Sequence, residues 1–299
     1  MTAPAPDPAA ALATVGWSAV GAPEPVAGGW DTFLWRFAAA DGRDHALRMH
    51  RPGNGTPERQ AWVARKEGAA IRACAEAGLP VAAIEAEGAY DGVPFAVQPW
   101  LPGVTLTRAL ERRPWQVWKL GREFGRMQAR LHRLKPDDLP ELQPEHWVGL
   151  VDHAALTEAA VRLAQPAVLC HLDFHPNNVL VERGRITGVV DFTNACIADP
   201  AYDLARTRTL LLHGPLKREL LTPAIQQLRK LLARAWASGY RAEAGALPRS
   251  AVFEAVALGV LLHDVRKAVA EGRGWATLRD VADLERMFRQ LLRAAGIED

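Results

Sequence analysis

The spacing of apolar residues divides the chain into two regions of different character. Beyond residue 103, apolar positions recur every three to four residues over long segments, which is the period of helices with one buried face. This pattern predicts helices over residues 115–134, 201–212, 223–237, 251–270 and 277–295. We therefore expect the second region to be mostly helical.

The first hundred residues contain shorter apolar runs that are interrupted by glycine. Residues 32–38 and 45–49 flank Asp41-Gly42, a strong turn signal, and this arrangement predicts a β-hairpin. Residues 80–84 and 95–97 are predicted to be further strands. A sheet is therefore expected in this part of the chain.

One helix is predicted beside this sheet, over residues 58–77, where the period is helical until Gly78. Residues 1–14 are rich in alanine and proline, which is typical of a loose tail. Leu101-Pro102-Gly103 has the composition of a hinge. We therefore expect three parts: a tail at 1–14, a β-rich unit at 15–101 and a helical unit at 102–299.

One segment of the helical region has a different pattern. Residues 179–181 and 186–190 are apolar runs on either side of a polar turn, which predicts a second hairpin. Asn178 and Asp191 stand immediately outside the two runs. With the turn centred between residues 184 and 185, they would face each other about 5 Å apart. Their oxygens are hard ligands, so the hairpin predicts a Mg²⁺ site.

Asp173 precedes Asn178 on the loop that enters this hairpin. Its carboxylate can accept a proton from an attacking hydroxyl while a bound cation neutralises a phosphate, a division of labour that suits phosphoryl transfer. Alone, Asp173 would be interpreted as a surface aspartate, and Asn178 and Asp191 as turn caps. Their combination favours a phosphotransferase site.

Composition narrows the class of protein. Hydrophobic residues make up 49% and charged residues 23% of the chain, as in ordinary soluble proteins. A net charge of +2 lacks the basic excess of nucleic-acid binders. Three scattered cysteines favour a reducing compartment, and neither a signal peptide nor a membrane-spanning stretch is found. We expect a cytoplasmic protein without a nucleic-acid or membrane partner.

The stretch from Cys170 to Leu204 resembles known kinases. His171, Asp173 and Asn178 form an HxDxxxxN pattern, and Asp191-Phe192 follows at the separation found in protein kinases. The fuller sequence, with HLDFHPNN, VVDF and DPAYDLAR, is more similar to the aminoglycoside phosphotransferase and choline kinase group. This resemblance implies a bilobal, protein-kinase-like α+β fold, with Mg²⁺ as cofactor and ATP or GTP as phosphate donor.

The resemblance also implies a phosphate clamp. Arg48 occupies the place of the phosphate-binding lysine, and Glu67 on the following helix would be its ion-pair partner. Arginine keeps the charge but presents a fork of donors instead of a single ammonium. The alternative is that both residues are solvated surface charges.

Two further segments would contact the nucleotide by the same resemblance. Gly28-Gly29 begins a loop over the phosphates that ends at Thr32. Gln98 begins the interlobe hinge, where the Pro99 carbonyl and the Leu101 N–H would receive an adenine edge, since proline has no N–H to donate.

Three residues are candidates for contact with the acceptor: His175, Glu254 and Asp264. Asp264 lies on an apolar helix face, so its carboxylate must be paired or face a cleft; an arginine partner and a cationic acceptor both remain open. His175 either contacts phosphate or substrate or braces the loop. We expect His171 to be structural, and the resemblance implies that Asp203 bonds buried backbone beneath the loop.

We therefore expect an ATP-dependent kinase that phosphorylates a hydroxyl of a small molecule, such as an aminoglycoside-like antibiotic or a related metabolite. Alternatives are a kinase for a macrolide, sugar or choline-like alcohol, and a nucleotide-binding pseudokinase. The presence of Asp173, Asn178 and Asp191 argues against a pseudokinase. Helix-like sequence resumes soon after Asp199-Pro200, which leaves no clear activation loop of the protein-kinase type.

Overall fold

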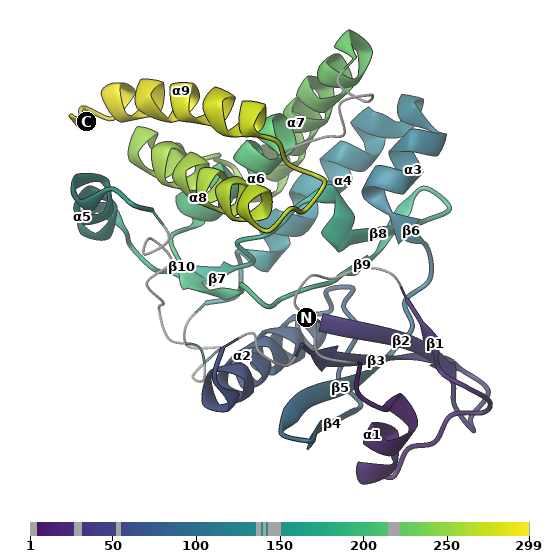
Figure 1. Ribbon diagram of the computed structural model, residues 1–299. Helices are drawn as coiled ribbons and strands as arrows, with labels where there is room; N and C mark the ends of the chain where they lie inside the picture. The colour runs from purple at the N-terminus through teal and green to yellow at the C-terminus, as the bar shows by residue number, and fades with distance from the viewer. Residues whose placement is uncertain are drawn as a thin grey trace.

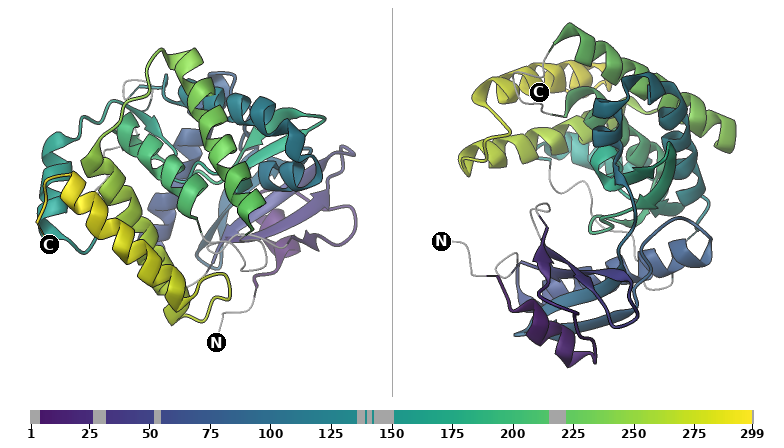
Figure 2. Two further views of the ribbon diagram at one scale, coloured as in Figure 1. Left: turned by 90° about the horizontal axis from the view of Figure 1, so that it is seen from above. Right: turned by 90° about the vertical axis from the view of Figure 1, so that its right-hand side faces the viewer.

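The chain folds into two lobes, one built around a sheet and the other mainly of helices (Figure 1). The computed structural model describes residues 5–26, 32–51, 55–135, 139, 142, 151–214 and 222–298. The view from the side in Figure 2 separates the lobes, with the sheet lobe containing the N-terminal part of the chain. The predicted α+β class with two lobes is therefore confirmed.

Within the described residues, the sheet lobe holds five antiparallel strands in the order β1-β2-β3-β5-β4. The predicted first hairpin is confirmed, because β2 and β3 pair along their whole lengths. The strand bounds are β1 Glu24–Pro25, β2 Thr32–Ala38, β3 Asp44–His50, β4 Ala86–Tyr90 and β5 Val93–Pro99.

The strand predicted at residues 80–84 is wrong. The chain makes only one isolated parallel bridge there, between Val81 and Val189, and the strand forms at β4 instead. Residues 86–90 contain glutamate and glycine, which have low strand propensity, but pairing with β5 outweighs that preference.

Helices cover both faces of this sheet. The predicted helix is α2 (Pro57–Glu76), and Thr56 caps it by accepting a hydrogen bond from the Arg59 N–H at 3.3 Å. Residues 8–14 form α1 (Pro8–Thr14), where a loose tail was expected. Asp7 caps this helix, and Leu12 is fully buried against the sheet, so packing explains the order.

Strand alternation sets the orientation of β3. Leu47 and Met49 are fully buried in the core on the α1 side of the sheet. Because successive side chains point to opposite faces, Arg48 points to the other face, where α2 lies. The sheet thus presents Arg48 towards a helix and the second lobe.

In the larger lobe, the five predicted helices are confirmed, although the helix predicted over residues 223–237 continues to Ala244. Two short helices, α3 and α5, were not predicted. No helix within the described part of the chain is long and apolar enough to cross a membrane. The helices are α3 Leu106–Arg112, α4 Val117–Leu131, α5 Ala154–Leu163, α6 Pro200–His213, α7 Pro223–Ala244, α8 Ala251–Ala270 and α9 Leu278–Ala294.

Helices α4 and α7 cross in close contact. Gly125 on α4 lies against the Trp236 carbonyl, and Gly239 on α7 lies against the Arg122 carbonyl. A Cβ at either position would collide with backbone, so glycine is required for the two helices to approach this closely.

The connection between the lobes runs from β5 through residues 100–103 to β6 (Val104–Thr105). β6 pairs with β8 (Val179–Glu182), which also pairs with β9 (Arg185–Val189). Two further short strands, β7 (Val168–Cys170) and β10 (Cys196–Ala198), pair beside this sheet. The hinge therefore leads directly into the sheet that contains the second predicted hairpin.

Candidate active site

The loop after β7 is held in an unusual conformation. Leu172 has φ +60°, a left-handed backbone that a leucine seldom adopts. Its N–H donates to Asp203 Oδ1 at 2.7 Å, and its carbonyl accepts from Arg206 Nε at 3.2 Å. Both partners are buried on α6, so this helix fixes the backbone immediately before Asp173.

Asp203 is itself held by a buried network. Its Oδ2 accepts from Gln128 Nε2 at 2.8 Å and pairs with His132 Nε2 at 2.8 Å. The ring of His132 also hydrogen-bonds the Tyr240 hydroxyl, at 2.9 Å. The implied bond from Asp203 to the loop backbone is thus present, whereas Gln128, His132 and Tyr240 gave no signal in the sequence.

Asp173 and Asn178 are in direct contact. Asn178 Nδ2 donates to the Asp173 carbonyl at 3.0 Å and to its carboxylate Oδ2 at 3.2 Å. His175 Nε2 lies 3.4 Å from the same Oδ2, while its Nδ1 accepts from the Asn177 N–H at 3.2 Å. His175 therefore both braces the loop and orients the Asp173 carboxylate.

The surroundings of Asp173 keep it ionised. Burial alone would raise the pKa of this carboxyl, but the hydrogen bond and charge of His175 oppose that effect. With Arg206 and His171 nearby, the pKa of Asp173 falls to about 2. Asp173 is therefore a carboxylate acceptor throughout the neutral pH range.

His171 is buried and packs against its neighbours in the loop. Its Nε2 lies 3.2 Å from the Val190 carbonyl oxygen, and its ring contacts Phe174 and Phe192. The structural role expected for His171 agrees with these contacts.

The second hairpin is confirmed, but its predicted register is wrong. Its turn is Arg183-Gly184, and a bulge lies between Leu180 and Val181. The Val190 N–H donates to the Asn178 carbonyl at 3.0 Å, so Val190 is the residue opposite Asn178. Asp191 follows with φ +65°, one position beyond the predicted alignment. The turn lies one residue earlier than predicted, which moves the alignment by two positions, and the extra residue of the bulge returns one of them.

Asp191 is joined to the sheet lobe. Its Oδ1 accepts from Arg48 Nη2 at 3.0 Å and from the Thr193 hydroxyl at 2.8 Å. The expected pair between Arg48 and Glu67 is present, with Nη1 and Oε2 2.5 Å apart. Arg48 therefore links α2, the strand β3 and the loop after β9.

The remaining oxygens have the chemistry of a divalent-cation site. Since its Nδ2 is used by Asp173, Asn178 has its Oδ1 left for a cation. Within the described residues, no hydrogen bond reaches that atom or Asp191 Oδ2. One amide oxygen and one carboxylate oxygen suit Mg²⁺, which fills its shell with phosphate and water. The residues present therefore fit the implied cation.

The predicted nucleotide contacts are placed only in part. Gly28 and Gly29 lie outside the described residues, while Thr32 is buried at the start of β2. Gln98 Nε2 donates to the Ala82 carbonyl at 2.7 Å, which fixes this side chain beneath the hinge. The Leu101 side chain packs over Gly188 on β9.

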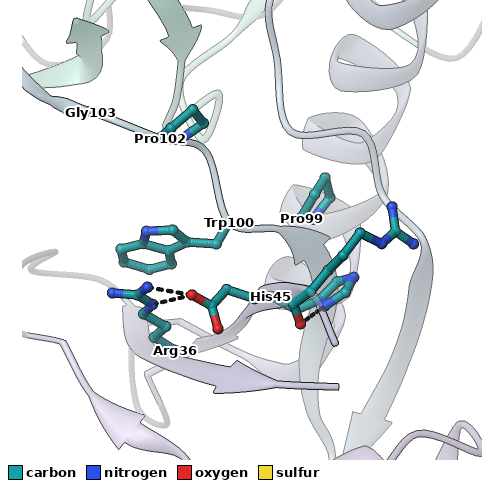
Figure 3. A pocket seen from close by; sticks show the side chains of 8 residues that line it. Arg36, His45, Pro99, Trp100, Pro102 and Gly103 are labelled. Carbon is teal, nitrogen blue, oxygen red and sulfur yellow. Dashed lines mark hydrogen bonds and ion pairs between the residues drawn. The ribbon is translucent and has the colours of Figure 1, made fainter. Parts of the chain in front are cut away.

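A cavity of about 590 Å³ lies beside the hinge (Figure 3). Pro99, Trp100 and Pro102 contribute to its lining, together with an ion pair between Arg36 and Asp44. The Arg36 guanidinium lies 5.2 Å from the centre of the Trp100 ring. A second cavity, of about 270 Å³, includes Arg48, Glu67 and Gln98 in its lining.

The two acceptor candidates on α8 differ in their surroundings. Glu254 is paired with Arg208 and, at 2.8 Å, with Arg249, so the ion-pair explanation holds for Glu254. The side chain of Asp264 makes no hydrogen bond or ion pair with any residue that the structure describes. Burial raises the pKa of Asp264, although Arg206 and His263 partly oppose the shift.

Comparison with known proteins finds relatives of the chain among phosphotransferases and kinases. The family described as "Phosphotransferase enzyme family" matches residues 23–165 and 150–246. An aminoglycoside 3'-phosphotransferase from Streptomyces fradiae is 29% identical over 175 residues, which are 50% of this chain and 65% of that protein. A homoserine kinase from Gluconobacter oxydans is 31% identical over 140 residues, 38% of this chain and 41% of that protein.

The matched segments therefore span less than two thirds of these relatives. Among solved structures, an amicoumacin kinase in complex with AMP-PNP, Ca²⁺ and Ami has a TM-score of 0.62 at 15% identity, over 91% of this chain and 88% of that chain. A macrolide 2'-phosphotransferase from Brachybacterium faecium has a TM-score of 0.52 at 20% identity, over 92% and 97%. The predicted protein-kinase-like fold is confirmed.

Proposed function

The chain belongs to the phosphotransferase enzyme family, and on that premise we propose that it transfers the γ-phosphate of a nucleoside triphosphate to a hydroxyl of a small molecule. The observation that carries the proposal is two groups of contacting side chains at the open end of the β8–β9 hairpin, where the Val190 N–H donates to the Asn178 carbonyl. Asp173 contacts Asn178, and Asp191 contacts Arg48, which contacts Glu67. Positioning and charge stabilisation of this kind are what phosphoryl transfer requires.

Asp173 acts on the acceptor hydroxyl. Its ionised carboxylate orients the hydroxyl for in-line attack and accepts the proton as the bond to phosphorus forms. His175 supports this role by holding Oδ2 at 3.4 Å. The two backbone hydrogen bonds of Leu172 also support this role, because they fix the conformation of the residue that precedes Asp173.

Asn178 and Asp191 hold Mg²⁺, and Arg48 binds the nonreacting phosphates while Glu67 holds its guanidinium in place. The cation neutralises phosphate charge when bound. ATP or GTP is the donor, seated at the hinge formed by Gln98, Pro99 and Leu101. This assignment is supported by AMP-PNP and Ca²⁺ in the amicoumacin kinase structure, which shares the fold.

The acceptor carries an amino group as well as a hydroxyl. Asp264 supports this assignment, because it is a half-buried carboxylate with no hydrogen bond or ion pair among the described residues, and the charge of Asp173 is one of the causes that raise its pKa. A cation would compensate the cost of its burial. Aminoglycoside-like antibiotics and small amino alcohols meet this requirement, as would the substrates named for the two sequence relatives.

The test is ADP release from Mg·ATP in the presence of hydroxyl-bearing acceptors, with Asp173→Asn as the control. The panel pairs amine-bearing acceptors, such as aminoglycosides and amino alcohols, with neutral sugars, nucleosides and macrolides. We expect stimulation by an amine-bearing acceptor that is lost in the control. Nucleotide binding without stimulation by any acceptor would favour a pseudokinase, and a lack of nucleotide binding would refute the proposal.

A further inference from the structure

Two residues of this chain depart from the protein-kinase pattern, and they touch each other. Arg48 stands in place of the phosphate-binding lysine, and Thr193 stands where the D-F-G motif has glycine. Arg48 Nη2 donates to the Thr193 hydroxyl at 2.9 Å. Glycine has no hydroxyl to accept this bond. Lysine has a single side-chain nitrogen, so it has no second nitrogen for position 193 when the first one pairs with Glu67.

The forked guanidinium of Arg48 explains why its second nitrogen, Nη2, needs a hydrogen-bond partner in the larger lobe. Nη1 of Arg48 lies 2.5 Å from Glu67, so the second arm of the fork projects towards the other lobe. There it meets Asp191 at 3.0 Å as well as Thr193. Lysine would present a single ammonium to Glu67 and would have no second arm to fix.

The Thr193 hydroxyl uses both of its hydrogen-bonding functions. It accepts from Arg48 Nη2 and donates its own proton to Asp191 Oδ1 at 2.8 Å. One hydroxyl thereby fixes the guanidinium edge and one carboxylate oxygen. The other oxygen of Asp191, Oδ2, is then the one directed to a cation.

We propose that Thr193 is a positioning residue that works as a pair with Arg48. It sets the orientation of Asp191 for the cation and of the guanidinium for the nucleotide phosphates. Arginine at position 48 and threonine at position 193 are thus one coupled replacement for the lysine and glycine of protein kinases. The inference rests on the proposed function, since it concerns the binding of the metal–nucleotide complex.

The first test is Thr193→Val, which keeps the shape of the side chain and removes the hydroxyl. Calorimetry would measure the dissociation constant for Mg·AMP-PNP, with no acceptor and no turnover. We expect binding to weaken about tenfold, since the hydrogen bonds of one hydroxyl to two charged groups are lost. Thr193→Ser should restore wild-type binding. Thr157→Val, on α5, is the matched control and should bind as the wild type does.

The second test is a double-mutant cycle with Arg48→Lys, which separates a positioning pair from two independent effects. In the Arg48→Lys background the guanidinium arm is absent, so Thr193→Val should weaken binding by no more than about threefold. The melting temperature without nucleotide should be the same for Thr193→Val and the wild type, which distinguishes positioning from folding.

The possible results separate the inference from the proposed function. If the wild type does not bind Mg·AMP-PNP, both are overturned. If the wild type binds but Thr193→Val binds equally well, or if Thr193→Ser fails to restore binding, only the inference is overturned. An equal loss from Thr193→Val in both backgrounds would also overturn it, because the two residues would then act independently.

Discussion

Asp173 combines a low pKa with a fixed position, and each property has a separate structural cause. His175 is foremost among the groups that lower its pKa, to about 2, against the effect of burial. The left-handed Leu172, held by Asp203 and Arg206, fixes the backbone. A carboxylate of such low basicity is a better orienting group than a strong base, which agrees with a loose transition state.

We expect Asp173→Asn to lower kcat by roughly 10²- to 10⁴-fold, since the amide cannot accept the hydroxyl proton. Nucleotide affinity should change little, because the amide can still bond Asn178 and no phosphate contact is removed. Steady-state ADP release gives kcat, and calorimetry with AMP-PNP gives the affinity. Full turnover in the variant would remove Asp173 from the assigned role.

Asp264→Asn tests the unpaired carboxylate on α8. Because burial raises the pKa of Asp264 in the folded protein, the folded state binds the proton more tightly and ionisation destabilises it. This destabilisation is absent at pH values below the pKa of Asp264 in the unfolded chain, and it is fully present at pH values above its pKa in the folded protein. The variant should therefore melt at a higher temperature than the wild type at pH 7, and the difference should vanish near pH 3.

The same variant should raise KM for an amine-bearing acceptor while leaving KM for the nucleotide unchanged. Thermal denaturation at several pH values and acceptor kinetics are the two measurements. A lower melting temperature at pH 7 with unchanged acceptor kinetics would point to a hidden ion pair instead.

For individual residues, the sequence predicted contacts well where the residues belong to a motif with fixed spacing. Asp173, Asn178 and the pair of Arg48 with Glu67 lie where spacing and resemblance put them. Thr193 was not predicted, because a threonine after Asp-Phe carries no signal until its hydroxyl is seen between two charged groups. Asp264 was recognised as unusual, but only the structure shows that its carboxylate has no partner among the residues described around it.

Among the elements, the helices were predicted best. Their periodicity extends over many residues, and their ends carry caps such as Thr56 before α2 and Ser250 before α8. Short elements depend on contacts between distant segments, which local pattern cannot reveal. Strand β4 forms because β5 is beside it, and the turn of the β8–β9 hairpin lies one residue earlier than predicted, so that Asp191 ends one position beyond the residue opposite Asn178 even with the bulge.

The crossing of α4 and α7 makes a prediction at the scale of elements. Gly125→Ala would put a methyl group into the Trp236 carbonyl, and the helices would have to separate. We expect a loss of about 3 kcal/mol in the free energy of unfolding, the upper part of the usual range for overpacking. Because Gln128 and Trp236 share this crossing and bond each other at 2.8 Å, kcat should fall as well.

Chemical denaturation measures this loss, and Gly274→Ala is the matched control. Gly274 has open space where a Cβ would be added, and its backbone is not in the left-handed region. An equal stability for both variants would mean that the α4–α7 crossing relaxes without cost.

At the scale of the whole molecule, the proposed cation site joins residues on two loops of the larger lobe to Arg48 of the sheet lobe. Mg·AMP-PNP should therefore raise the melting temperature. At a ligand concentration of a hundred times the dissociation constant, the free energy of unfolding should increase by about 2.7 kcal/mol. Asp191→Ala should abolish the part of this shift that requires Mg²⁺. Differential scanning calorimetry with Mg²⁺ or with EDTA gives the comparison.

If the Mg²⁺-dependent shift persisted in Asp191→Ala, the cation would have to be held elsewhere. The two-lobed arrangement itself was predicted from the switch between strand-like and helical patterns near residue 103. The packing of α1 on the sheet was not, because an alanine- and proline-rich sequence resembles a tail until Leu12 is seen to be buried.

The C-terminal end of the hinge, Pro102-Gly103, is held by contacts with the larger lobe. Thr187 on β9 bonds the Pro102 carbonyl at 2.7 Å, and Gly103, at φ +116°, leaves no room for a Cβ against the Val181 carbonyl. Any rotation of one lobe against the other must therefore take place between the end of β5 and Pro102. Such a rotation would leave the hairpin from Asn178 to Asp191 intact, since the hairpin lies wholly within the larger lobe, and would separate Arg48 on β3 from Asp191 and Thr193. The two proposed cation ligands would thus keep their spacing while the contacts between the lobes are broken.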